Sequence, residues 1–212
     1  MVEHEILLKK LYHYGIRGSA HDWFKSYLSG RKQFVSVNGT DSDPLPLLYG
    51  VPQGSILGPL LFIIYINDLP NVSNLVKFIL YADDANIIIT APTIEEVITL
   101  TRQILESLSN WVDSNRLLLN LKKTHYMIFS QTNNKFSNLN LSLHGVQLKR
   151  ETESKFLGVI IDEKLTWKKH ITTLKTKMAR YLGVMYRLRT QIPLKARLLI
   201  FHSFIQSHLN YC

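Results

Sequence analysis

The chain has 212 residues, of which 46% are hydrophobic and 19% are charged, so it can form a buried core and is not a disordered tail. Its one cysteine, Cys212, excludes a disulfide framework and a cysteine-rich zinc site within the chain. The formal net charge of +9 favours polyanionic partners.

The basic residues are concentrated in the second half of the sequence. Residues 1–112 hold 8 basic and 11 acidic side chains, whereas residues 113–212 hold 17 basic and 5 acidic ones. From Lys164 onward there are ten Lys and Arg residues and no acidic residue. This segment is either a nucleic-acid-binding surface or a solvated helix face, and its charge alone does not decide between them.

The sequence also allows a prediction of where in the cell the protein lies. The longest apolar run, 56–66, is interrupted by Gly58 and Pro59 and is shorter than the roughly 20 residues that span a bilayer. The N-terminus is acidic and lacks the basic start of a signal peptide. We therefore expect an intracellular protein without a membrane partner, with the nucleus among the candidate compartments.

Hydrophobic periodicity predicts a mixture of helices and strands. The expected helices cover 5–14, 19–29, 55–67, 94–111, 167–188 and 194–208, and the expected strands cover 33–37, 75–81, 86–90, 126–129, 139–143 and 156–161. Capping boxes are expected at Ser19 and Thr93, and turns at 38–39, 133–134 and 144–145. This order predicts an α+β domain over residues 1–162, followed by a basic helical unit over residues 163–212.

The pair Asp83 and Asp84 is the sharpest local feature. It lies in the short connection 82–85 between two β-rich runs, where a hairpin tip can present both carboxylates. Neighbouring like charges are unfavourable unless a cation offsets them, and Mg²⁺ prefers carboxylate oxygens. Two such ions can activate an attacking hydroxyl and stabilise a leaving phosphate. The alternative is an ordinary acidic turn.

Two motifs resemble reverse transcriptases. Tyr81-Ala82-Asp83-Asp84 resembles their catalytic tetrapeptide, which lies on a hairpin of the polymerase palm. The segment 50–62, Gly-Val-Pro-Gln-Gly-Ser-Ile-Leu-Gly-Pro-Leu-Leu-Phe, together with 65–70, resembles the long block of non-LTR (LINE-like) retrotransposon enzymes. Group II intron reverse transcriptases share parts of both motifs, but Ser55, Gly58-Pro59 and 66–70 fit the LINE-like pattern better.

The chemistry of the long block agrees with nucleotide binding. Gly54 has no side chain and lets a base or sugar approach the backbone, and Gln53 offers an amide donor and acceptor. Free N–H groups at a helix start suit phosphate. A capped, buried helix without a ligand is the alternative interpretation.

Further segments follow in the family's order. Residues 27–33 resemble the stretch before the long block, residues 120–124 resemble the motif after the palm helix with Lys123 as its lysine, and residues 156–158 resemble the hairpin that grips the primer. A lysine at that place can donate a proton to leaving pyrophosphate or balance its charge. An exposed surface lysine and a core strand are the respective alternatives.

The resemblance implies a palm-like antiparallel sheet packed with helices, followed by thumb-like helices, and an RNA-directed DNA polymerase. It implies two Mg²⁺ ions held by Asp83 and Asp84, an RNA template, a DNA primer and deoxynucleoside triphosphates. The implied catalytic residues are Asp83, Asp84 and Lys123; the nucleotide- and template-binding residues are Pro52, Gln53, Gly54 and Tyr81; and the nucleic-acid-binding residues are Arg31, Gln33, Phe156, Leu157, Gly158, Lys168, Lys169 and Lys175.

The family's palm has three carboxylates, and the first lies on a strand upstream of the helix that residues 2–8 resemble. The chain is therefore expected to begin just after that aspartate, to be incomplete at both ends, and to be inactive or nearly so alone. The alternatives are a catalytically dead nucleic-acid-binding remnant, a structural palm-like domain of a decayed element and a group II intron-type reverse transcriptase.

Overall fold

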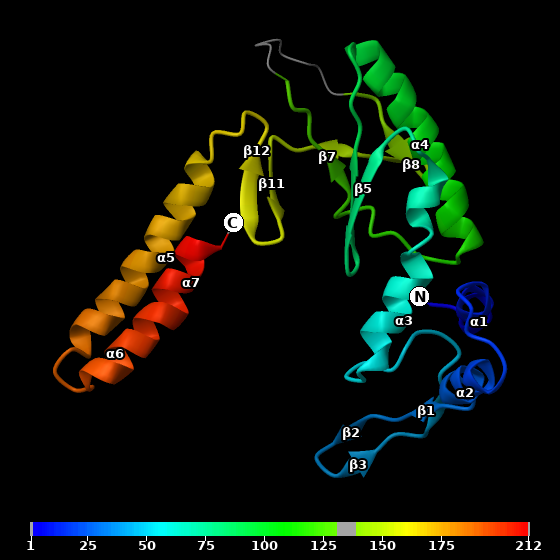
Figure 1. Ribbon diagram of the computed structural model, residues 1–212, viewed down its shortest axis with the longest axis horizontal. Helices are drawn as coiled ribbons and strands as arrows, with labels where there is room; N and C mark the ends of the chain where they lie inside the picture. Colours follow the sequence, from blue (N-terminus) through cyan, green and yellow to red (C-terminus); the bar gives the residue numbers. More distant parts are fainter. Residues whose placement is uncertain (1, 131–138, 212) are drawn as a thin grey trace. The chain divides into compact units, whose positions relative to one another are not determined.

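The computed structural model describes residues 2–130 and 139–211, and these residues form two compact units. Residues 2–124 and 139–148 form unit 1, and residues 125–130 and 149–211 form unit 2. Figure 1 shows that both units combine helices with short strands.

Unit 1 contains most of the helices and the longest hairpin. Its elements are α1 (His4–His13), α2 (Ser19–Leu28), β1 (Lys32–Gln33), β2 (Ser36–Val37), β3 (Thr40–Asp41), β4 (Leu45–Pro46), α3 (Leu57–Ile66), the 3₁₀ helix η1 (Leu69–Val72), β5 (Lys77–Tyr81), β6 (Asp84–Ile88), α4 (Ile94–Ser114), β8 (Ser142–Leu143) and β9 (Val146–Gln147).

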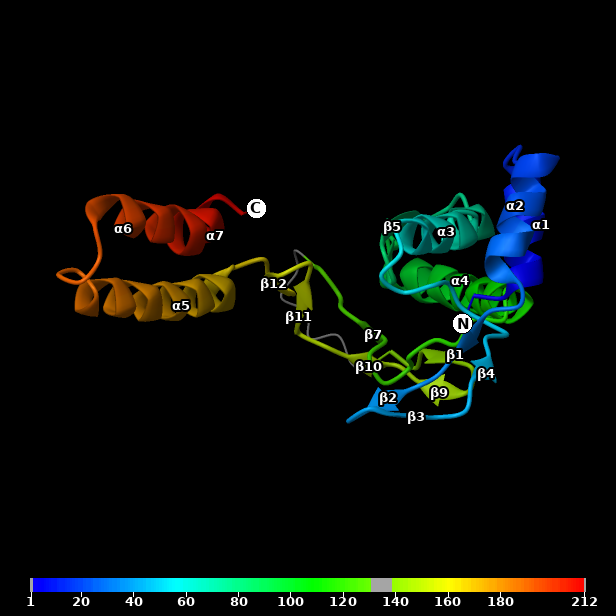
Figure 2. The same cartoon turned by 90° about the horizontal axis from the view of Figure 1, so that it is seen from below.

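Unit 2 begins with strands and ends in helices. Its elements are β7 (His125–Tyr126), β10 (Lys149–Arg150), β11 (Glu153–Phe156), β12 (Val159–Asp162), α5 (Lys168–Arg187), α6 (Leu194–Phe201), the π-helix η2 (His202–Gln206) and α7 (Ser207–Asn210). Figures 1 and 2 both show α5 running beside the α6–α7 segment.

The α+β class expected from the sequence is confirmed. In the described part of the chain the strands form six two-stranded ladders instead of one continuous sheet. Five ladders are antiparallel, and β7 pairs with β10 in parallel. Most of these strands are only two residues long, so each ladder exchanges few hydrogen bonds and depends on neighbouring elements for its stability.

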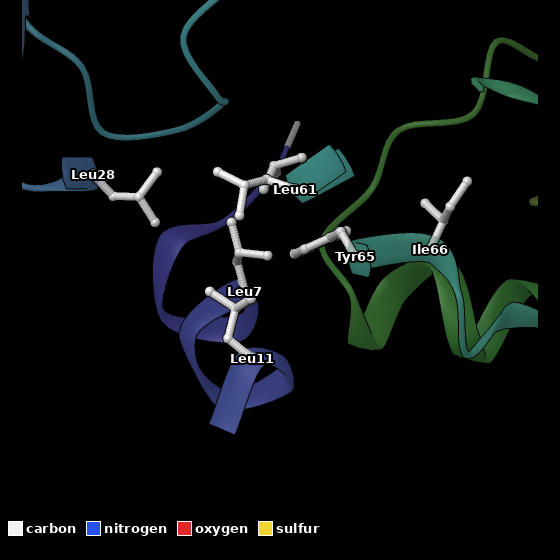
Figure 3. Packing of buried hydrophobic residues seen from close by; sticks show 7 residues of the cluster. Leu7, Leu11, Leu28, Leu61, Tyr65 and Ile66 are labelled. Atoms are coloured by element: carbon white, nitrogen blue, oxygen red, sulfur yellow. The ribbon is translucent and has the colours of Figure 1, made fainter. Parts of the chain in front are cut away.

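The core of unit 1 lies between α1, α2 and α3. Leu7 and Leu11 on α1, and Leu61 and Tyr65 on α3, are four residues apart and therefore lie on one face of each helix. Figure 3 shows Leu7 between Leu11 and Leu61, with the Tyr65 ring pointing toward it. The remaining buried members of this core cluster are Val2, Leu28 and Ile66.

The hydroxyl of the buried Tyr65 joins three segments of unit 1. It donates a hydrogen bond of 2.6 Å to the Asn115 carbonyl and accepts one of 3.3 Å from the Glu3 backbone N–H. The carboxylate of Glu3 forms an ion pair with the Arg116 guanidinium at 2.8 Å. Burial raises the pKa of Tyr65, which keeps the hydroxyl protonated as the donor.

Lys10 fixes the C-terminal end of α3. Its Nζ donates to the Tyr65 carbonyl at 2.5 Å and to Asp68 Oδ1 at 2.7 Å. It also lies 4.8 Å from the centroid of the Tyr65 ring and 5.1 Å from that of Trp111. Because its charge is paired and its remaining surroundings are aromatic, this largely buried lysine is accommodated without an unsatisfied cation.

Several local expectations are confirmed. The helices of residues 5–14 and 94–111 form as α1 and α4, and Thr93 Oγ1 accepts from the Glu96 N–H as its capping box requires. The turn at 38–39 is confirmed by left-handed backbone at Asn38 and Gly39 between β2 and β3. Residues 133–134, where another turn was expected, lie outside the described residues.

Several local expectations are wrong, among them those for α2, for residues 156–161 and for the final helix. Helix α2 begins at Ser19 itself, with Gly18 before it and no side-chain cap. The segment 156–161 is not one strand, because Leu157 and Gly158 adopt positive φ and turn the chain between β11 and β12. The final helix is interrupted by the π-helical residues 202–206, an irregularity that hydrophobic periodicity does not signal.

Among the described residues, no helix is both long enough and apolar enough to cross a membrane. Helix α3, the apolar run of the sequence, has ten residues.

We predict that Tyr65→Phe lowers the free energy of unfolding by about 1–2 kcal/mol, because it leaves a buried carbonyl and a buried N–H without their partner. Tyr14→Phe is the matched control, since its hydroxyl accepts an exposed bond from Asn67 that water can replace. Chemical denaturation measures both variants. An equal loss of stability in the two would contradict the role assigned to Tyr65.

Candidate active site

The two aspartates lie at the tip of the β5–β6 hairpin. Tyr81 pairs with Asp84, so the loop consists of Ala82 and Asp83 alone. Ala82 has φ 50°, the left-handed backbone that tight hairpin loops require. The expected four-residue connection is thus shorter, with Asp84 as the first residue of β6.

The pairing register of β5 and β6 determines which side chains lie on the same face of the hairpin. Leu80 pairs with Ala85 across the hairpin, and Leu80 packs against the core cluster of unit 1. Tyr81 and Asp84 pair directly and therefore lie on the opposite face, while Asp83 lies in the turn. The hairpin is anchored on one side and presents polar groups on the other.

The carboxylates of Asp83 and Asp84 are both exposed, as is the Tyr81 ring. Solvent screens the repulsion between the carboxylates, and their oxygens are the ligands that a hard divalent cation prefers. Within the part of the chain that the structure describes, no group of three or more His, Cys, Asp or Glu residues could hold a metal ion. Two carboxylates alone would supply only part of a coordination shell, which water or phosphate oxygens would have to complete.

The segment before α3 forms a tight turn that exposes Gln53. The Ser55 N–H donates weakly to the Pro52 carbonyl at 3.4 Å, and Gly54 has φ 80°. A positive φ at the third position of such a turn favours glycine. The Gln53 side chain and Gly54 therefore face solvent, as the proposed nucleotide contact requires.

Ser55 links this turn to α3. Its Oγ donates to the Pro52 carbonyl at 2.7 Å and accepts from the Gly58 N–H at 3.0 Å. The hydroxyl thus satisfies one N–H of the first helical turn, although it lies one residue before the formal cap, Ile56.

Gly58 allows the turn to lie directly on the helix. A Cβ at this position would be 2.6 Å from the Pro52 carbonyl oxygen and 3.1 Å from Ser55 Oγ. A backbone oxygen cannot move aside as a flexible side chain can, so only glycine fits here. Sequence analysis noted Gly58 but did not identify this contact, which no local pattern reveals.

The Pro52–Ser55 turn and the β5–β6 hairpin are both connected to the core cluster of unit 1. Val51 before the turn and Leu80 in β5 both pack against the core cluster that includes Leu61 and Tyr65. Among the described residues, no hydrogen bond or ion pair joins Gln53 to either aspartate.

Lys123 lies in a compact turn of unit 1. The Asn120 carbonyl accepts N–H bonds from Lys123 at 2.9 Å and from Thr124 at 3.1 Å. The Lys123 side chain is exposed, and its role beside a leaving pyrophosphate stays a prediction.

Arg31 and Gln33 lie at the base of the arm formed by β1 to β4. The Arg31 carbonyl accepts from the Leu47 N–H at 2.8 Å, and Gln33 pairs with Leu45. Both side chains are exposed, and the Arg31 guanidinium lies 5.5 Å from the Tyr27 ring centroid. Their contact with nucleic acid stays a prediction.

In unit 2, Phe156, Leu157 and Gly158 form the tip of the β11–β12 hairpin. Leu157 has φ 44° and Gly158 φ 90°, and Phe156 pairs with Val159 across them. The Tyr211 hydroxyl donates to the Leu157 carbonyl at 2.5 Å and so holds this tip. A hairpin at this place agrees with the resemblance, but the grip on a primer stays a prediction.

The three candidate lysines of α5, Lys168, Lys169 and Lys175, are all exposed. Lys169 forms an ion pair with Glu153 of β11, which offsets part of its charge. Along α5 and its two flanking residues, Trp167 and Ile171 are exposed. The other apolar residues at helical spacing are partly buried: Leu174, Met178, Tyr181, Met185 and Leu188.

Sequence analysis missed Asp162, whose carboxylate organises the start of α5. It accepts from the N–H groups of Thr166, Trp167 and Lys164 at 3.0–3.1 Å. These hydrogen bonds, that of the Thr166 N–H above all, lower the pKa of Asp162. An aspartate at the end of a β-rich run was the available signal.

Comparison with known proteins agrees with this arrangement. Residues 1–161 match the family described as reverse transcriptase (RNA-dependent DNA polymerase). The chain therefore belongs to the reverse transcriptase family.

The similar curated proteins come from mobile elements of flies. The RNA-directed DNA polymerase from mobile element jockey of Drosophila melanogaster is 29% identical over 88% of this chain and 21% of its own length. The jockey protein of Drosophila funebris is 34% identical over 71% of this chain and 17% of its own length. The probable RNA-directed DNA polymerase from transposon X-element of Drosophila melanogaster is 28% identical over 88% of this chain and 21% of its own length. The chain thus spans about a fifth of these relatives, and the expected LINE-like resemblance is confirmed.

We predict that Gly58→Ala destabilises the chain by about 1–3 kcal/mol, because the clash with the Pro52 carbonyl outweighs the better helix propensity of alanine. Gly183→Ala in α5 is the control: nothing lies within 4 Å of its Cβ, so the propensity gain of up to about 1 kcal/mol should be observed. Denaturant unfolding measures both, and a neutral Gly58→Ala would refute the close contact.

Proposed function

We propose that this chain is part of an RNA-directed DNA polymerase of a non-LTR retrotransposon and that Asp83 and Asp84 are metal ligands of its catalytic centre. The observation that carries the proposal is the tight tip of the β5–β6 hairpin, which exposes two consecutive aspartates in a chain of the reverse transcriptase family. The expected substrates are deoxynucleoside triphosphates on an RNA template and a DNA primer.

Asp83 and Asp84 offer the type of ligand atom that Mg²⁺ prefers, since both have carboxylate oxygens and the hairpin tip is open to solvent. When bound, two such ions would polarise the primer 3′-hydroxyl and the triphosphate oxygens during nucleotidyl transfer. The carboxylates of Asp83 and Asp84 bind these positively charged ions at the hairpin tip. Gln53 and Gly54 orient the nucleotide, and Lys123 balances charge or gives a proton to the pyrophosphate.

The remaining assignments extend the same proposal. Residues 1–162 serve as part of the fingers and palm, and residues 163–212 as a thumb-like segment whose lysines contact nucleic-acid phosphates. These contacts would be independent of sequence and weakened by salt. An intracellular location, with the nucleus among the candidates, also stays a prediction.

A nucleic-acid-binding remnant without catalysis is the second candidate. The acid-free sequence from Lys164 to the end and the exposed lysines of α5 favour it, because they need no metal to bind phosphate. A group II intron-type enzyme is disfavoured by the mobile-element relatives that the chain resembles.

Asp83→Asn and Asp84→Asn are each predicted to reduce Mg²⁺-dependent primer extension on an RNA template by about 100-fold or more, since each removes a charge that the metal needs. Template–primer affinity should change little, because neither residue supplies a phosphate contact. The assay is run on this chain and on a protein of the relatives' length that contains it.

Asp41→Asn, an exposed acid of β3, is the control and should retain synthesis. Full synthesis by Asp83→Asn in the longer protein would contradict the catalytic assignment. Tight nucleic-acid binding without synthesis in any wild-type form would support the remnant.

A further inference from the structure

The N-terminal segment of unit 1 holds the backbone of Gly50, which lies two residues before the Pro52–Ser55 turn. The Gly50 N–H donates to the Val2 carbonyl at 2.7 Å, and Glu3 forms an antiparallel bridge with Tyr49. On the other side, His4 Nε2 lies 2.7 Å from the Gly50 carbonyl oxygen. Both backbone polar groups of Gly50 are therefore engaged.

The Gly50 carbonyl determines the direction of its hydrogen bond with His4. A carbonyl oxygen only accepts hydrogen bonds, so Nε2 must carry the proton and donate. Gly50 has φ 90°, a conformation that a glycine adopts without strain, and the His4 bond holds it there.

The exposed tip of the turn lies between two anchors. His4 and Val2 hold Gly50 on the N-terminal side, and the Ser55 hydroxyl holds the Pro52 carbonyl on the C-terminal side. Gln53 and Gly54 lie between these anchors and face solvent. The His4 side chain comes from the start of α1, 46 residues away in sequence, so its removal releases the Gly50 carbonyl while the Val2 bond to the Gly50 N–H and the packing of α3 remain.

We infer that His4 is a positioning residue, which acts through the Gly50 carbonyl to hold Gln53 and Gly54 in the orientation that binds the incoming nucleotide. This inference rests on the proposed function, because it assumes that the turn binds a nucleotide. The structural part, that His4 orders the turn, stands on the hydrogen bonds alone.

The test compares three variants of the full chain. His4→Ala removes the donor, and His4→Gln keeps an amide N–H at nearly the reach of Nε2. His21→Ala is the matched control, since His21 Nε2 also bonds a backbone carbonyl, that of Leu8 at 3.1 Å, but at the α1–α2 contact. Two quantities are measured: hydrogen exchange of the Gly50 and Ser55 amides, and the Kd of a Mg²⁺–deoxynucleoside triphosphate in the presence of an RNA–DNA template–primer.

His4→Ala is expected to speed exchange of the two amides about fivefold to tenfold and to raise the nucleotide Kd by a similar factor, the loss expected for one hydrogen bond. The affinity for template–primer should not change. His4→Gln should restore both quantities, and His21→Ala should leave both at the wild-type value.

Equal exchange of the turn amides in His4→Ala and His21→Ala would overturn the inference, whatever the nucleotide result. Faster exchange without any change of a measurable nucleotide Kd would also overturn it. A wild-type chain that binds no nucleotide would count against the proposed function of the turn, and the exchange data would still decide whether His4 orders it.

Discussion

The placement of two carboxylates on consecutive residues at the tip of the β5–β6 hairpin is the electrostatic constraint on which the proposed metal site depends. In a dry interior such a pair would be strongly unfavourable, because neighbouring like charges repel and neither can be solvated. At the exposed tip of β5 and β6, water screens the repulsion and leaves both side chains open to solvent. The proposed metal site requires this same exposure.

A charged tip is useful only on a fixed base, and unit 1 supplies one. The hairpin packs on the core through Leu80, and the Pro52–Ser55 turn is connected to it through Val51. Tyr65 lies in that core and joins α3 to the N-terminal segment and to the end of α4 by its hydroxyl. His4 bonds the backbone before the Pro52–Ser55 turn, and Ser55 bonds the Pro52 carbonyl within it. These contacts link residues far apart in sequence, which is why neither motif could function as an isolated peptide.

The sequence predicted the elements that local rules control. The two β-rich runs on either side of Asp83 and Asp84 predicted the hairpin, and the 3/4 spacing after Thr93 predicted α4 with its cap. The failures arose where tertiary contacts decide. No local pattern shows that Gly58 faces the Pro52 carbonyl or that Ser19 lies within α2, and the apolar run 156–161 conceals the turn at Gly158. The family assignment came from motif resemblance, because composition and periodicity alone define only an α+β domain with an acidic tip and a basic end.

The most direct measurement is a titration of the isotope-labelled chain with Mg²⁺, followed by the backbone amide signals of residues 81–85. The account predicts a saturable shift confined to the hairpin tip, which is lost when both aspartates are replaced by asparagine and which sodium at equal ionic strength does not produce. Shifts that are spread over the surface, or a tip that does not respond while the hairpin remains folded, would contradict it.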